Sequence, residues 1–271
     1  MSAPKLKKET DAESAFCTYS LKSEIKNIIA EFFHFDRRII RTLRVLLFQP
    51  WKLMTSNSNP LDDTYIAPLK LYLAVNFVFF LLIPLLSTPN FEVFSFNLES
   101  FVQSNTSFQT IVTEQIERMQ ITPEIYTERF NAHIKYNQSA WIFLMIPFYA
   151  VILALLNVKN HRPFIDYLHF STYFLSSFLI QLLLSIALYR TLCAAIQPIV
   201  NVSSVLGLVF ICFLLLGLVY FLFQSHKLYI KNSWLLSGLK SVILLILFFV
   251  TFSGYVQFLF YNTLIALRLG Y

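Results

Sequence analysis

The sequence predicts an all-α fold: a polytopic membrane bundle of about five transmembrane helices, preceded by a basic amphipathic helical segment in the cytoplasm. Hydrophobic residues make up 56% of the chain and charged residues 13%, whereas soluble domains average about 45–50% and about 25%. Several apolar runs approach the ~20 residues that cross a hydrocarbon core. Ten lysines and arginines precede the first run, so the basic charge also predicts an orientation.

Residues 1–20 are polar and mixed in charge, which predicts a disordered tail. They contain no signal-peptide core, so we expect the start of the chain to be retained. Residues 21–68 predict cytoplasmic or interfacial amphipathic helices followed by a linker. The first helix begins at Leu21, and the linker is the turn-forming stretch from Thr55 to Asp63.

A second amphipathic helix lies between Asp36, which suits an N-cap, and Pro50, which marks its end. One predicted face carries Ile39, Ile40, Leu43, Leu46 and Leu47, and the other carries Arg37, Arg41 and Arg44. Together with Arg38, these arginines are the predicted binding site for an anionic leaflet or a cytoplasmic partner, since each basic residue near a membrane surface contributes about 1 kcal/mol. A solvated helix packed on its own protein is the alternative.

Five apolar runs follow and predict a transmembrane bundle over residues 69–262. We place the spans at Leu69–Leu86, Ser139–Asn157, Asp166–Tyr189, Ser204–Gln224 and Ser237–Tyr261. The segment between the first two spans carries three basic residues and six glutamates. The positive-inside rule therefore places the N-terminus in the cytoplasm and this segment outside.

Residues 88–138 predict an extracytoplasmic helical loop. Thr122 and Pro123 suit the N-cap and first position of a helix, and Glu124 suits its first turn. Apolar residues then recur every four positions, at Tyr126, Phe130 and Ile134. This spacing predicts a helix with one apolar stripe.

The third span carries polar residues on one helical face, which we call the polar stripe: Asp166, His169, Tyr173, Ser176, Ser177, Gln181 and Ser185. Polar groups at membrane depth face a bundle interior or a wet cavity. One interpretation is a pathway or pocket lined by Asp166, His169, Tyr173, Ser177 and Gln181. The other is hydrogen bonding between helices, with Asp166 as a cap.

The sequence contains no nucleotide-binding glycine motif, no zinc-protease motif and no paired cysteine ligands. Cys17, Cys193 and Cys212 lie far apart, so they predict neither a disulfide framework nor a zinc site. The net charge of +6 lies beside membrane spans and does not predict nucleic-acid binding. We expect no catalytic residues, no metal and no cofactor, and we expect membrane lipids as partners.

Phe35-Asp36-Arg37, Arg41-Thr42-Leu43-Arg44, Gln49-Pro50 and Pro68-Leu69-Lys70-Leu71-Tyr72 resemble an uncharacterised family of bacterial integral-membrane proteins. Pro147 and the stretch Asp166-Tyr167-Leu168-His169-Phe170 are similar too, so the resemblance runs from about Glu31 to Leu188. It implies a multi-pass protein of the bacterial inner membrane and no established activity. Many relatives carry an N-terminal zinc ribbon, which is missing here because Cys17 stands alone. Relatives also tend to have an acidic residue followed by histidines where this chain has Asp166, Tyr167 and Tyr173.

The leading functional prediction is a non-enzymatic scaffold or binding component that contacts anionic lipid or a cytoplasmic partner. The alternative is a small transporter or channel that uses the polar stripe. Five spans in one copy make a thin-walled bundle, so transport would favour a homo-oligomer. An intramembrane enzyme, with Asp166 and His169 as an acid and base pair, comes third.

Overall fold

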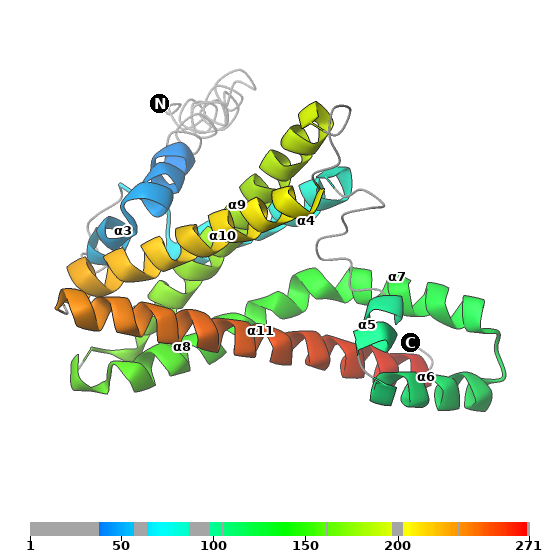
Figure 1. Ribbon diagram of the computed structural model, residues 1–271. Helices are drawn as coiled ribbons and strands as arrows, with labels where there is room; N and C mark the ends of the chain where they lie inside the picture. The colour runs from blue at the N-terminus through cyan, green and yellow to red at the C-terminus, as the bar shows by residue number, and fades with distance from the viewer. Residues whose placement is uncertain are drawn as a thin grey trace, which may run out of the picture.

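The computed structural model describes residues 38–56, 64–86, 98–104, 106–160, 162–196, 203–231 and 233–269 (Figure 1). These residues are almost entirely helical, and no strand occurs among them, which confirms the all-α prediction. The predicted tail over residues 1–20, the helix from Leu21, the Asp36 cap and Arg37 lie outside the described residues.

Four described helices are long and apolar enough to cross a membrane. They are α4 (Pro68–Leu86), α9 (Phe164–Ile196), α10 (Ser203–Gln224) and α11 (Trp234–Leu269). The protein is therefore a multi-pass membrane protein. All four corresponding predicted spans begin within three residues of these helices, because the apolar runs are long and uninterrupted.

A bent pair of helices is the candidate for a fifth span. It consists of α7 (Pro123–Trp141), the short 3-10 turn η2 (Ile142–Leu144) and α8 (Met145–Leu156), with a bend of 45° between its halves. The polar first part of α7 lies outside the apolar stretch. Arg190 at the end of α9 donates from Nη1 to the carbonyl oxygen of Leu85 at the end of α4, at 2.6 Å. Because α4 and α9 run side by side and end together, the chain between them must return across the bundle through α8 (Figure 1).

Helix α9 is the centre of the bundle and packs against α4, α8 and α10. Every residue from Phe170 to Leu179 is buried. Serines on this helix let neighbouring backbones approach closely; the hydroxyl of Ser171 donates to the carbonyl oxygen of Ile146 in α8 at 2.7 Å.

Helix α11 is longer than the predicted span, which ended at Tyr261. Its 36 residues extend about 54 Å at ~1.5 Å per residue, well beyond a hydrocarbon core of ~30 Å. The extra length packs on α7 and lies beside α5 (Leu98–Ser104) and α6 (Thr106–Met119), as Figure 1 shows. The predicted span ended too early because α11 continues beyond Tyr261, where Thr263, Leu264 and Leu267 are buried.

The helices α5, α6 and α7 hold the far end of α11 through an aromatic cluster, defined as Phe101, Phe108, Phe130 and Phe260. The ring centroids of Phe108 and Phe260 lie 4.2 Å apart, and those of Phe101 and Phe260 lie 5.0 Å apart. The predicted helix from Pro123 is α7, and its apolar stripe of Tyr126, Phe130 and Ile134 is buried.

At the other end of the bundle, a helix over residues 38–48 is followed by α3 (Pro50–Ser56). Pro50 ends the first helix, as predicted, and occupies the first position of the next one, where no N–H is needed. Helix α3 packs on α9 and on η4 (Ser225–Tyr229), a π-helical turn that ends α10.

Candidate functional site at the basic helix

The helix over residues 38–48, called the basic helix below, is tied to the bundle by two polar contacts. The hydroxyl of buried Thr42 donates to the carbonyl oxygen of Arg38 at 2.7 Å and accepts from the backbone N–H of Ile66 at 3.2 Å. Tyr220 of α10 donates its hydroxyl hydrogen to the carbonyl oxygen of Phe48 at 2.7 Å. These contacts fix which face of the basic helix points away from the protein.

The outward face of the basic helix is both cationic and apolar. Arg38, Arg41 and Arg44 are exposed, and so are Ile40 (66%) and Phe48 (64%). Of the predicted apolar face, Leu46 is fully covered by the bundle, whereas Ile40 is exposed. Arginines beside exposed apolar side chains are typical of a helix that lies in a membrane interface.

Arg41, Arg44, Val45, Phe48 and Gln49 line a cleft of about 500 Å³, called the arginine cleft below. Among the described residues, neither Arg41 nor Arg44 forms an ion pair with an acidic side chain. Both side chains are exposed and line the cleft. A planar guanidinium binds the oxygens of a phosphate or carboxylate in a bidentate manner.

The polar stripe begins at the same end of the bundle, where α9 starts. Asp166 lies in the first turn of α9 and accepts from Arg162 at 3.5 Å. The helix starts two residues before Asp166, so the predicted capping role was wrong and an ion pair with Arg162 takes its place. His169 is half-buried one turn further on, and Tyr173 is buried.

The middle of the polar stripe is packed between helices. Gln181 donates from Nε2 to the hydroxyl oxygen of Ser177 at 2.8 Å, and both residues are buried. A Cβ atom on Gly217 of α10 would lie 2.9 Å from Cδ of Gln181, so α10 approaches α9 closely at this point. Ser185 donates to the carbonyl oxygen of Gln181 at 2.6 Å. These contacts favour interhelical packing over a water-lined pathway.

The structure also brings together polar residues at the C-terminal end of α8 and near the N-terminal ends of α9 and α11. The sequence did not single out these residues as a group. Lys240 of α11 donates from Nζ to Oδ1 of buried Asn157 at 2.8 Å. Tyr167 donates its hydroxyl hydrogen to the carbonyl oxygen of Asn157 at 3.1 Å. Arg162 donates from Nη2 to the carbonyl oxygen of Tyr229 at 2.8 Å and lies 4.0 Å above its ring. The signal that could have found this network is Lys240, a lone cation inside an apolar run.

No family model, curated protein or solved structure matches this chain. The resemblance to a bacterial membrane family stays a prediction. Among the described residues, no group of three or more histidine, cysteine, aspartate or glutamate side chains is placed to hold a metal ion.

Proposed function

We propose that this multi-pass membrane protein is a non-enzymatic scaffold whose basic helix binds the headgroups of anionic lipids. The observation that supports this proposal most directly is the arginine cleft, which Arg41 and Arg44 line together with exposed Phe48 and which contains no acidic residue among its described lining. An anionic phospholipid supplies the matching pair of features, a phosphate for Arg41 and Arg44 and hydrocarbon for Phe48.

We further propose that the basic helix lies at the cytoplasmic face of a bacterial inner membrane. The distribution of charge supports this orientation. Lys159, Arg162, Lys227 and Lys231 lie in the turns between α8 and α9 and between α10 and α11, at the end of the bundle where α3 packs on η4. A concentration of basic residues at one end is typical of the cytoplasmic side, where the leaflet is anionic.

A cytoplasmic protein with an acidic surface would use the same two arginines. The lipid is favoured because exposed Ile40 and Phe48 lie on the same helix as the arginines, and the carbonyl oxygen of Phe48 accepts a hydrogen bond from Tyr220 of span α10. The transporter alternative has less support, since Ser177, Gln181 and Gly217 fill the middle of the polar stripe.

Charge reversal at the arginine cleft tests the proposal. Full-length protein is released from nanodiscs that contain equal amounts of phosphatidylglycerol and phosphatidylcholine, and retained lipids are counted by native mass spectrometry. In R41E/R44E we expect the preference for phosphatidylglycerol to fall at least about tenfold, because each arginine contributes ~1 kcal/mol.

The matched control is R118E/R129E, which reverses two exposed arginines on α6 and α7 at the opposite end of the molecule. This control should keep the wild-type lipid preference. An unchanged preference in R41E/R44E would refute lipid binding at the arginine cleft. Binding of an acidic protein without any lipid preference would support the partner alternative instead.

A further inference from the structure

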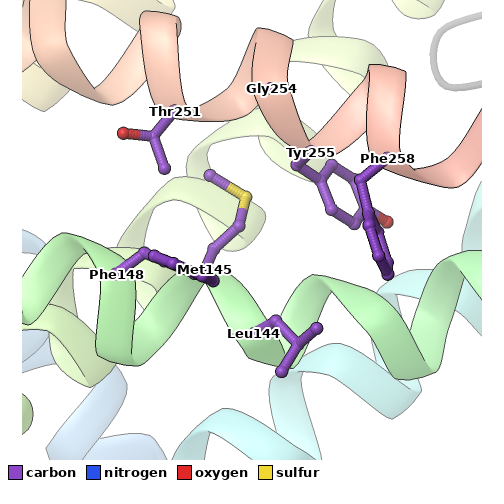
Figure 2. A pocket seen from close by; sticks show the side chains of 7 residues that line it. All are labelled: Leu144, Met145, Phe148, Thr251, Gly254, Tyr255 and Phe258. Carbon is purple, nitrogen blue, oxygen red and sulfur yellow. The ribbon is translucent and has the colours of Figure 1, made fainter.

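A second hollow lies between the bent pair and α11, far along the chain from the basic helix. It is a pocket of about 360 Å³, shown in Figure 2 and called the α8–α11 pocket below. Leu144, Met145 and Phe148 line one side, and Thr251, Gly254, Tyr255 and Phe258 line the other. Its volume falls in the range of about 300–1,000 Å³ that is usual for small-ligand sites.

The polar atoms of the lining are already bonded within the protein. Thr251 donates its hydroxyl hydrogen to the carbonyl oxygen of Leu247 at 2.8 Å. Tyr255 donates its hydroxyl hydrogen to the carbonyl oxygen of Gln138 at 2.7 Å. With both hydroxyl hydrogens committed, the pocket offers little to water or to a polar ligand, since ordered water needs two to four polar partners. A hydrocarbon chain therefore suits this apolar lining better than a polar ligand.

The shape of the pocket is that of a slot along the two helices. In Figure 2, Phe148 lies at one end and Phe258 at the other, between the facing surfaces of α8 and α11. Both rings are partly exposed, Phe148 at 63% and Phe258 at 41%, so the slot is open to the surrounding medium. Gly254 forms part of one wall, and a Cβ atom at this position would meet nothing within 4 Å.

Trp141 marks the depth of the slot in the bilayer. Its ring lies 5.2 Å from the ring of Phe258 in an edge-on contact. Tryptophan is enriched at the boundary between hydrocarbon and headgroups. Before Trp141, α7 becomes polar, with Asn137 bonded to His133 at 3.0 Å. The slot therefore opens just inside the leaflet on the side of α5, α6 and α7.

We propose that the α8–α11 pocket binds one acyl chain of a phospholipid from that leaflet. A second copy of the protein is a poorer occupant, because seven lining residues are far fewer than the ~20–30 per partner in a stable interface. A helix of ~10 Å diameter is also too wide for a slot of this volume. This site is independent of the arginine cleft, which lies at the other end of the bundle.

Photocrosslinking in nanodiscs tests the proposal. Full-length protein is reconstituted in nanodiscs with a phosphatidylcholine that carries a diazirine near the end of one acyl chain. The nanodiscs are irradiated, and the labelled peptides are identified by mass spectrometry. We expect the labels to concentrate at residues 144–148 and 251–258. In G254L we expect them to fall about tenfold there, because the new side chain displaces about two buried methylene groups.

The matched control is G238L, the same substitution on the same helix at a glycine whose added Cβ also meets nothing within 4 Å. It should label like the wild type. If G254L fails to fold, F148A provides the same test, because it removes one end of the slot through an exposed side chain. We expect F148A to reduce labelling severalfold at an unchanged melting temperature.

Labels spread evenly over the lipid-facing surface of α11 would overturn the proposal. Equal labelling in wild type, G254L and G238L would overturn it as well. A shift of G254L from dimer to monomer, measured by native mass spectrometry, would assign the slot to a second copy instead. The loss of lipid preference in R41E/R44E has no bearing on these outcomes, since neither arginine lines the slot.

Discussion

Arg41 and Arg44 differ in their surroundings from Arg162 and Lys240, which lie at the same end of the bundle. Arg162 is held by the carbonyl oxygen of Tyr229 and by Asp166, and Lys240 is held by Asn157. Arg41 and Arg44 are exposed and have no acidic partner among the described residues. Arg162 and Lys240 are bonded within the bundle, whereas Arg41 and Arg44 line the arginine cleft, where we propose that lipid headgroups bind.

Gly217 is the residue on which the packing of the polar stripe depends. A Cβ atom there would press against the side chain of Gln181, with Cδ at 2.9 Å. We expect Gly217→Ala to lower the free energy of unfolding by about 1–3 kcal/mol, the usual cost of overpacking a core. The measurement is thermal unfolding of the detergent-solubilised protein.

Gly207→Ala is the control for this prediction. Gly207 lies on the same helix, and an added Cβ meets nothing within 4 Å, so alanine should be neutral or stabilising by up to about 1 kcal/mol. Equal melting temperatures for the two variants would contradict close packing of α9 on α10. They would favour a polar stripe with room for water.

The sequence could predict that the polar stripe lies on one face of a helix, but it could not predict which helix packs against that face. Spacing along α9 determines which residues share a face, whereas packing depends on α10. The partner surface is Gly217, which has no side chain and therefore leaves no pattern in the apolar run. Lys240 was overlooked for a similar reason, because its partner Asn157 lies 83 residues away.

At the scale of elements, the bent pair departs most from the predicted helices. The predicted span Ser139–Asn157 contains the 3-10 turn at Ile142–Leu144, which lies shortly before Pro147. Proline has no backbone N–H to donate to the carbonyl oxygen of Phe143, four residues earlier, and its ring crowds that carbonyl, so a bend is expected in this turn. Pro147 is therefore the local signal of the bend, whereas the direction in which the helix bends depends on packing against α11.

The far half of α11 depends on Phe260 at the centre of the aromatic cluster. Phe260→Ala should lower the free energy of unfolding by about 3–5 kcal/mol, as for other large buried rings. Its effect should concentrate on α5, α6 and α7, whose rings contact Phe260. Limited proteolysis should then cut near Gln120, the turn residue with a positive φ of 54° between α6 and α7.

Ile265→Ala serves as the control, because Ile265 lies on the same helix with its side chain exposed. This variant should resist the protease as the wild type does. If Phe260→Ala and Ile265→Ala were cut at the same rate, the aromatic cluster would not be what holds α5, α6 and α7 on α11.

At the scale of the whole molecule, the two ends of the bundle carry different chemistry. One end consists of the basic helix, α3 and the cationic turns that contain Arg162 and Lys231. At the other end, α5, α6 and α7 surround the C-terminal end of α11 (Figure 1). The sequence predicted this division because charge and apolar runs are local properties. It could not predict the arginine cleft, since Val45 and Gln49 were not part of the predicted basic face.

The depth of the basic helix in the membrane tests the central claim most directly. A nitroxide is attached to a single cysteine at position 48, or at position 136 as the control, in a cysteine-free background. Tyr136 of α7 is 83% exposed and should lie in water. Both proteins are reconstituted in nanodiscs with phosphatidylglycerol, and collisions with oxygen and with a water-soluble nickel complex are measured by electron paramagnetic resonance.

At position 48 we expect strong relaxation by oxygen and weak relaxation by the nickel complex, since the apolar face of an interfacial helix is buried ~5–10 Å below the headgroups. At position 136 the nickel complex should dominate. Equal access of the nickel complex to positions 48 and 136 would place the basic helix in water and contradict its binding to an anionic leaflet.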